Sequence, residues 1–163
     1  MAVDMFMKID GIDGESTDDK HKKWIELFSY SYGVSQPASG ASRTGGRTGG
    51  RADFDQFTAV KSIDAATVNL NRYCVSGKHI PKIEVEFCLA AGEKHCFMKY
   101  TLEDVIISSV RPGGSSNGEE VRPLEELGIL YGKITTEYTP IDQTGKAGAA
   151  LKFKWDLEAN KEA

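Results

Sequence analysis

Cys74 and His79 are the side chains of this sequence that come nearest to a nucleophile and its base. The reactive form of cysteine is the thiolate, which a helix N-terminus or a neighbouring cation stabilises. Cys74 is predicted to lie in the last turn of a helix, where the negative end of the helix dipole disfavours a thiolate. We therefore interpret Cys74 as a core cysteine rather than a catalytic one.

Glu84 and Glu86 are a second pair that could do chemistry, as the two carboxylates of a glycosidase. On a strand, residues two apart lie on one face and about 7 Å apart, a spacing that inverting glycosidases use. Catalytic carboxylates normally approach a substrate from different elements, however, and Lys82 continues the same polar face. A solvated strand face is the better interpretation of this pair.

The histidines and cysteines show none of the spacings typical of metal sites. His95 and Cys96 are adjacent, but His21 is distant, and no HExxH or EF-hand pattern occurs. The three cysteines, Cys74, Cys88 and Cys96, form an odd set without a CxxC pair, which argues against a disulfide framework. P-loop, GxGxxG and GxSxG motifs are also absent. We expect reduced, mostly buried thiols and no catalytic, metal or cofactor site.

Three arginines, Arg43, Arg47 and Arg51, lie in the near-repeat RTGGRTGGR within residues 34–52. Arginine spaced by glycine resembles RNA-binding tracts, but here no aromatic residues are interleaved and the chain carries a net charge of −4. Two interpretations stay open. The segment is either a loop that docks on a partner through arginine–carboxylate pairs or a flexible loop with no fixed conformation.

The one helix that the sequence predicts spans residues 64–76. Asp64 is a good N-cap candidate, and Gly77 is suited to the left-handed position that ends a helix. Apolar residues recur at helical spacing between them, at Ala66, Leu70, Tyr73 and Cys74. We expect this stripe to dock on a sheet, because a helix this short is not stable alone.

Alternating apolar and polar residues predict strands in most of the remaining chain, for example over residues 2–9, 82–89 and 151–157. In the segment from Trp24 to Tyr32, the aromatic residues are expected to face a core. Ser29 and Ser31 alternate with them and are expected to face a wet surface. About seven or eight strands in hairpin order predict a mainly β fold, an antiparallel barrel or sandwich flanked by one short helix.

Composition narrows the classes of function. A chain of 163 residues with 40% hydrophobic and 27% charged residues is typical of one soluble domain, here residues 1–163. The negative net charge argues against a nucleic-acid partner. No apolar run is long enough for membrane insertion, and residues 1–10 lack the continuous apolar segment of a signal peptide. We expect a cytoplasmic protein that leaves the cell only through a dedicated machine.

Several stretches, taken in chain order, resemble the haemolysin-coregulated protein (Hcp) family. They are residues 2–9 (AVDMFMKI), 14–16 (GES), 31–37 (SYGVSQP), 61–64 (KSID), 76–79 (SGKH), 105–110 (VIISSV), 138–140 (YTP) and 154–157 (KWDL). The resemblance implies a two-sheet β-barrel like that of phage tail tube proteins. It also implies a homo-hexameric ring that stacks into the inner tube of the type VI secretion system, with no catalytic residues and no cofactor.

The resemblance also implies partners and roles. Sheath, spike and effector proteins would be the partners, and the tube would be assembled in the cytoplasm and then secreted. Residues 34–52 correspond to a loop that projects toward the neighbouring ring, so Arg43, Arg47 and Arg51 are predicted to contact acidic residues of that ring. Ser29 and Ser31 are predicted to line the lumen. The alternatives are an RNA-binding module that uses the Arg/Gly-rich loop, or a secreted effector built on the same barrel.

Overall fold

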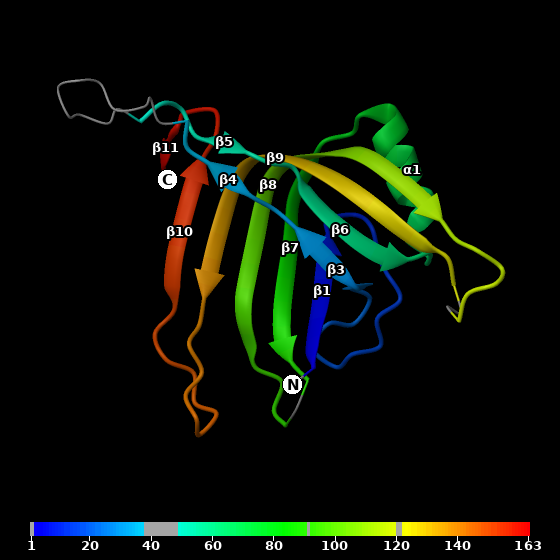
Figure 1. Ribbon diagram of the computed structural model, residues 1–163, viewed down its shortest axis with the longest axis horizontal. Coiled ribbons are helices and arrows are strands. Elements are labelled where there is room, and N and C mark those ends of the chain that lie inside the picture. The colour runs from blue at the N-terminus through cyan, green and yellow to red at the C-terminus, as the bar shows by residue number, and fades with distance from the viewer. Residues whose placement is uncertain (1, 38–48, 91, 120–121) are drawn as a thin grey trace.

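Strands make up most of the regular secondary structure in the computed structural model, which describes residues 2–37, 49–90, 92–119 and 122–163 (Figure 1). The elements are β1 (Val3–Ile9), β2 (Ile25–Leu27), β3 (Ser29–Ser31), β4 (Val34–Ser35), β5 (Asp53–Phe54), β6 (Phe57–Ser62), α1 (Thr67–Ser76), β7 (Ile80–Leu89), β8 (Cys96–Gly113), β9 (Leu124–Tyr138), β10 (Leu151–Asp156) and β11 (Lys161–Glu162). The fold is mainly β with one short helix, as predicted.

Nine of these strands form one antiparallel sheet in the order β11-β10-β9-β8-β7-β1-β2, and β6 joins it by pairing with both β9 and β3. Only Phe28 separates β2 from β3, and its backbone N–H donates to the carbonyl of Val60 in β6 at 2.8 Å. The sheet therefore curls, so that β3 and β6 close it between β2 and the first part of β9, while β10 and β11 extend beyond this closure. The two predicted sheets are two layers of this one folded sheet, and β3 and β6 form the smaller layer (Figure 1).

The long strands β8 and β9 hold the two layers together. The first part of β9 pairs with β6, from Leu124 to Ile129, and its last part pairs with β10, from Lys133 to Tyr138. β8 follows β9 along both parts, with an irregularity between Ile107 and Ser109. This hairpin is the frame on which the smaller layer and the helix are placed.

The main core lies between the layers and is rich in aromatic rings. Tyr30 of β3 lies over Phe57 of β6, Phe87 of β7 and Tyr100 of β8, with ring centroids 4.4–5.9 Å apart. Burial raises the pKa of the Tyr100 hydroxyl, with a further contribution from its hydrogen bond to Tyr30. These contacts link residues that lie on both layers.

The segment that contains Phe28 differs from its prediction. Ile25 and Leu27 are buried in the core, whereas the Phe28 side chain is 63% exposed. Tyr30 returns to the core side, so the alternation is interrupted at Phe28. The physical reason is that the chain changes strand partners at Phe28: β2 pairs with β1, and β3 pairs with β6 in the smaller layer. The residue at this crossing does not follow the alternation of the two strands.

Helix α1 begins later than predicted. Ala66 occupies the N-cap position without a side-chain cap, and the carboxylate of Asp64 instead accepts from the Ala66 N–H at 2.9 Å and pairs with Lys61 Nζ at 2.9 Å. The C-terminal prediction is confirmed, because Gly77 has φ 64° and follows the last helical residue. Leu70 is fully buried against the sheet.

Candidate functional site

Ser29 and Ser31 are both exposed on β3, in register with Val60 and Thr58 of β6. Their backbones are held by this pairing, so the hydroxyls are available to whatever lies outside the subunit. Their exposure agrees with the predicted wet surface. Their place in a lumen remains a prediction.

Of the three predicted loop arginines, only Arg51 lies within the described residues. Its Nη2 donates to the backbone carbonyl of Leu157 at 2.5 Å, and Leu157 N–H in turn donates to Gly132 O at 2.9 Å. Arg51 thus fastens the C-terminal side of the 34–52 segment to the end of β10. Arg43 and Arg47 lie outside the described residues, and the role of the loop in ring stacking remains a prediction.

The structure does not assemble the two candidate pairs into active sites. Cys74 is half-buried on α1 and packs against the core, as predicted for a core cysteine. His79 is exposed, and its Nδ1 lies 3.2 Å from Asp104 Oδ1.

Glu84 and Glu86 project from β7 on the face opposite the main core, and Lys99 Nζ lies between them, 2.9 Å and 3.3 Å from their Oε1 atoms. Burial raises the pKa of Glu84, but the hydrogen bond and charge of Lys99 outweigh it and hold this pKa below its usual value. Both side chains are less than one-fifth exposed. The predicted solvated face is therefore wrong for these two residues, because His21 of the 15–24 segment contacts Glu86, and Lys82 and Lys99 flank Glu84.

His21, within the 15–24 segment, is the centre of a buried cluster. In the sequence it lies far from His95 and Cys96 and is set aside for that reason, whereas the fold brings it to Cys96. Its ring is 2% exposed and stacks on Phe6 of β1, with centroids 4.2 Å apart. Nδ1 lies 2.8 Å from Asp18 Oδ2, and Nε2 lies 2.7 Å from Glu86 Oε2. The local pair Asp18 and His21 is a visible sequence signal, whereas the partner 65 residues away on β7 is not.

Asp18 is held in turn by Lys94, whose Nζ forms an ion pair with Asp18 Oδ1 and a second one with Asp4 at 3.1 Å. The hydrogen bond from Lys94 is the main cause that lowers the pKa of Asp18 to about 2, against a smaller opposing effect of burial. Asp18 is therefore an ionised anchor for the His21 ring near neutral pH.

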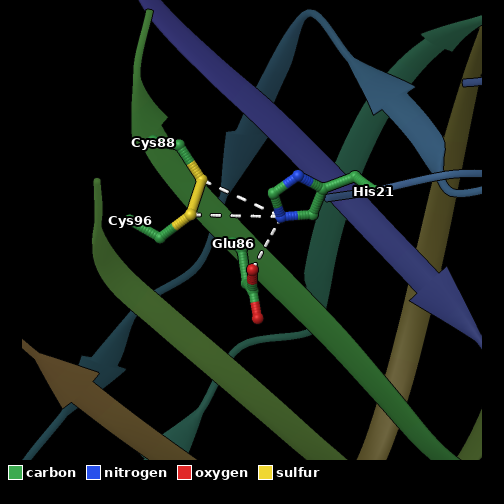
Figure 2. Close-up of side chains that lie close together, drawn as sticks. All are labelled: His21, Glu86, Cys88 and Cys96. Atoms are coloured by element: carbon green, nitrogen blue, oxygen red, sulfur yellow. Dashed lines mark hydrogen bonds and ion pairs between the residues drawn. A yellow bond between two sulfur atoms is a disulfide. The ribbon is translucent and has the colours of Figure 1, made fainter. Parts of the chain in front are cut away.

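Cys88 and Cys96 are joined by a disulfide, which corrects the prediction of three reduced thiols. The register places Cys88 of β7 opposite Cys96 at the start of β8, on either side of the hairpin turn. Their sulfur atoms lie 3.9 Å and 4.0 Å from His21 Nε2 (Figure 2). The signal in the sequence was that both cysteines border the predicted turn at residues 90–94.

A cleft of about 880 Å³ is lined by the exposed Phe28, between β2 and β3, and by the half-buried Leu124 at the start of β9. The ion pair of Arg122 with Glu15, 2.8 Å long, lies at this cleft. β10 lies on the opposite side of the molecule from β3, the strand that follows Phe28 (Figure 1). In the register, Trp155 lies beside the fully buried Ile134, so the core face of the sheet continues onto β10.

That continuation is uncovered. Leu151 is 67% and Phe153 42% exposed on β10, and Tyr138 beside Leu151 is 45% exposed. β6 pairs only with the first part of β9 and so does not extend over this region. The molecule thus has two different surfaces with exposed apolar groups, one at Phe28 and one on β10.

Residues 6–138 match the model of a family described as "Type VI secretion system effector, Hcp". The chain belongs to the Hcp family. The protein Hcp1 of Pseudomonas aeruginosa is 37% identical to it over 165 residues, and the match covers the whole of both chains. The resemblance read from the sequence is confirmed.

Solved structures of Hcp proteins are also similar to this chain. One structure of a type six secretion system protein is 39% identical, covers 99% of this chain and 100% of its own, and has a TM-score of 0.95. Hcp1 from Salmonella typhimurium is 36% identical over 100% of both chains, with a TM-score of 0.83.

As a member of the Hcp family, the chain is a structural tube protein of the type VI secretion system. The proteins of this family are secreted. The RNA-binding alternative gains no support from these relatives. The word "effector" in the family description is applied to Hcp itself, so it does not indicate a separate effector domain. In the described ranges, no helix is long and apolar enough to span a membrane.

Proposed function

We propose that this Hcp chain is a non-enzymatic subunit that closes into hexameric rings, and that the rings stack into the type VI inner tube. The uncovered core face on β10 carries the proposal, because Leu151 and Phe153 would be covered by a neighbouring subunit. A closed ring requires two different patches on each subunit, which meet head to tail. The β10 face and the Phe28 cleft supply such a pair, since β10 and β3, the strand that follows Phe28, lie on opposite sides of the molecule (Figure 1).

The first test is the native mass, measured by light scattering after size exclusion at several concentrations. We expect six times the 17.8 kDa of the chain, with stacked multiples at high concentration. Phe153→Asp should reduce the mass to that of a monomer, because a charge would be buried in the ring interface. Val68→Asp is the control, since Val68 is also apolar and is more exposed than Phe153 but lies on α1. A wild-type monomer at all concentrations would contradict the proposal.

Stacking is proposed to depend on Arg43, Arg47 and Arg51, through carboxylates of the next ring. The observation that supports it is that Arg51 already fixes the base of the loop to the Leu157 carbonyl. Arg43→Gln with Arg47→Gln should shorten the tubes seen by electron microscopy while the ring mass stays unchanged. Tubes of unchanged length would remove the arginines from stacking.

The lumen is proposed to carry Ser29 and Ser31, because both hydroxyls are exposed on a backbone that pairing fixes. Small polar residues would give the effectors a wet, weakly adhesive wall. Ser31→Trp should impair effector retention and leave the hexamer intact. Loss of the hexamer would instead place these residues in a subunit interface. The sheath and spike proteins are the remaining proposed partners, and assembly is proposed to take place in the cytoplasm.

A further inference from the structure

His21, Glu86, Cys88 and Cys96 bring one imidazole nitrogen, one carboxylate oxygen and two sulfurs together, all within 4.8 Å of one another (Figure 2). The four side chains come from three parts of the chain: the 15–24 segment, β7 and the start of β8. Imidazole, carboxylate and thiolate are the donors that Zn²⁺ uses in proteins, and four of them complete a closed tetrahedral site. Tube assembly, as described above, uses none of these four groups.

The nitrogen–sulfur distances are close to those around a zinc ion, whereas His21 Nε2 and Glu86 Oε2, 2.7 Å apart, have to move apart to bind one. Typical Zn–S and Zn–N bonds place nitrogen and sulfur ligands of one tetrahedral ion about 3.5 Å apart. His21 Nε2 lies 3.9 Å from Cys88 Sγ and 4.0 Å from Cys96 Sγ. The two sulfurs are bonded to each other here, so they have to separate before they can bind a metal. Small side-chain rotations therefore separate the disulfide form from a ligand cage.

The surroundings hold the imidazole in the orientation that a ligand requires. Asp18 accepts from Nδ1 at 2.8 Å, which leaves Nε2 as the nitrogen that faces Glu86 and the sulfurs. A carboxylate on the far ring nitrogen is the usual second partner of a zinc-bound histidine. The ring is also fixed by stacking on Phe6 and by an edge contact with Trp24, with centroids 4.8 Å apart.

Two of the four donor side chains are closed to water, and the other two, Glu86 and Cys96, are partly buried. His21 is 2% exposed and Cys88 is fully buried, although both lie outside the main core cluster. Lys99 binds the other oxygen of Glu86 at 3.3 Å, so Oε2 is directed at the cluster. Four protein donors that leave no coordination position for water are typical of structural rather than catalytic zinc.

We propose that the reduced form of this cluster binds one Zn²⁺ through His21 Nε2, Glu86 Oε2, Cys88 Sγ and Cys96 Sγ, and that the disulfide form does not. A dithiol reductant supplies two electrons and two protons, which split the S–S bond into two thiols while the reductant becomes a disulfide. Zn²⁺ then displaces to water the two thiol protons and the proton shared by His21 Nε2 and Glu86 Oε2, and it binds the thiolates, the imidazole and the carboxylate. Metal and disulfide are mutually exclusive states of the same four side chains.

The test compares the two redox forms of the full-length chain. One sample is reduced with a dithiol, desalted without oxygen and titrated with Co²⁺ and then Zn²⁺, and the other is titrated as the disulfide. We expect the reduced form to give a thiolate–cobalt charge-transfer band and the visible spectrum of tetrahedral cobalt, saturating at one equivalent and removed by Zn²⁺. The disulfide form should give neither. Absence of the cobalt spectrum from the reduced form would overturn the proposal.

Variants assign the ligands. Cys88→Ser with Cys96→Ser should abolish the spectrum, whereas Cys74→Ser removes the one cysteine outside the disulfide and should leave it unchanged. Asp18→Asn should weaken zinc affinity by about 10- to 100-fold in competition with a chromophoric chelator, because the imidazole loses its orienting partner. A spectrum that survives the double serine variant, or disappears with Cys74→Ser, would place the metal elsewhere and overturn the assignment.

Discussion

Two buried polar clusters in this protein differ in kind: one is a fixed ion pair, and the other contains groups that can change their redox state. Lys61 of β6 and Glu125 of β9 are cross-strand neighbours, and both are completely buried. Lys61 Nζ contacts Glu125 Oε2 at 3.1 Å and Asp64 Oδ1 at 2.9 Å. The Thr67 hydroxyl of α1 donates to the same Glu125 oxygen at 2.7 Å. This cluster therefore fixes the beginning of the helix to the smaller layer.

The His21 cluster is less completely buried, with Glu86 and Cys96 partly exposed, and it is made of groups that can change state. Its sulfurs can be bonded or separate, whereas the Lys61 cluster offers one set of charges with one arrangement. The effect of burying polar groups therefore depends on the chemistry of those groups. A fixed ion pair sets position, and a set of redox-active donors adds a second state. The following experiments alter the Lys61 cluster or the His21 cluster and measure the effect on stability.

The largest effect is expected where one partner of the fixed ion pair is removed. Lys61→Met should lower the free energy of unfolding by about 3–5 kcal/mol, because Glu125 would stay buried without its counter-charge. The double variant Lys61→Met with Glu125→Leu should recover most of that loss, since no charge is left in the core. Denaturant unfolding at one fixed protomer concentration measures both. A double variant as unstable as the single one would show that the loss does not come from leaving the charge of Glu125 unpaired.

The disulfide is expected to have the next largest effect, and only in one redox state. Closing a loop of this length stabilises by about 2–3 kcal/mol in the chain-entropy account. Cys88→Ser with Cys96→Ser should cost that much under oxidising conditions and much less, relative to wild type, after reduction without metal. Thermal unfolding under both conditions is the measurement. An equal cost in both states would mean that packing of the sulfurs, rather than the bond, is responsible.

The smallest effect is expected at Asp18, as a dependence of stability on pH. Its pKa is lowered to about 2 in the folded chain, first by the hydrogen bond from Lys94, against an ordinary value near 3.8. A lowered pKa stabilises the fold above the ordinary value, and this contribution is lost as the pH falls from about 4 to 2. Asp18→Asn should cost about 1 kcal/mol near neutral pH and flatten that decline.

The control for this prediction is Asp19→Asn at the adjacent position. Asp19 forms no ion pair within the described part of the chain. Its replacement should therefore leave the decline of the unfolding free energy at acidic pH unchanged. Unfolding curves collected from pH 2 to pH 6 compare the two variants. Equal slopes for both would remove Asp18 as the group responsible.

Much of the fold could be predicted because its signals are local. Ile83, Val85 and Phe87 alternate in the sequence and are buried on one face of β7. The helix end could be read from Gly77. Its start could not, because the Asp64 carboxylate is shared with the Lys61 ammonium, a tertiary contact that no helix pattern contains.

The candidate sites also divide into features with a local sequence signal and features that depend on tertiary contacts. Exposure of Ser29 and Ser31 followed from alternation, while Phe28 was misplaced because crossing between layers interrupts the period. The His21 cluster depends on register and on a chain segment folded over the outer face of β7. The near-adjacency of Cys88 and Cys96 on either side of a turn was present in the sequence, but their pairing required the strand register.

The long β8–β9 hairpin makes the resistance of the molecule to mechanical force depend on the direction of the force. Its hydrogen-bonded ladder runs through both layers, from Met98 with Tyr138 to Gly113 with Leu124. A load along these strands must break many bonds at once, in shear, whereas a load across them peels the bonds one after another. Resistance to forced unfolding is set by the unfolding rate under load rather than by equilibrium stability. A subunit loaded along β8 and β9 would therefore withstand the thrust of export far better than one loaded across them.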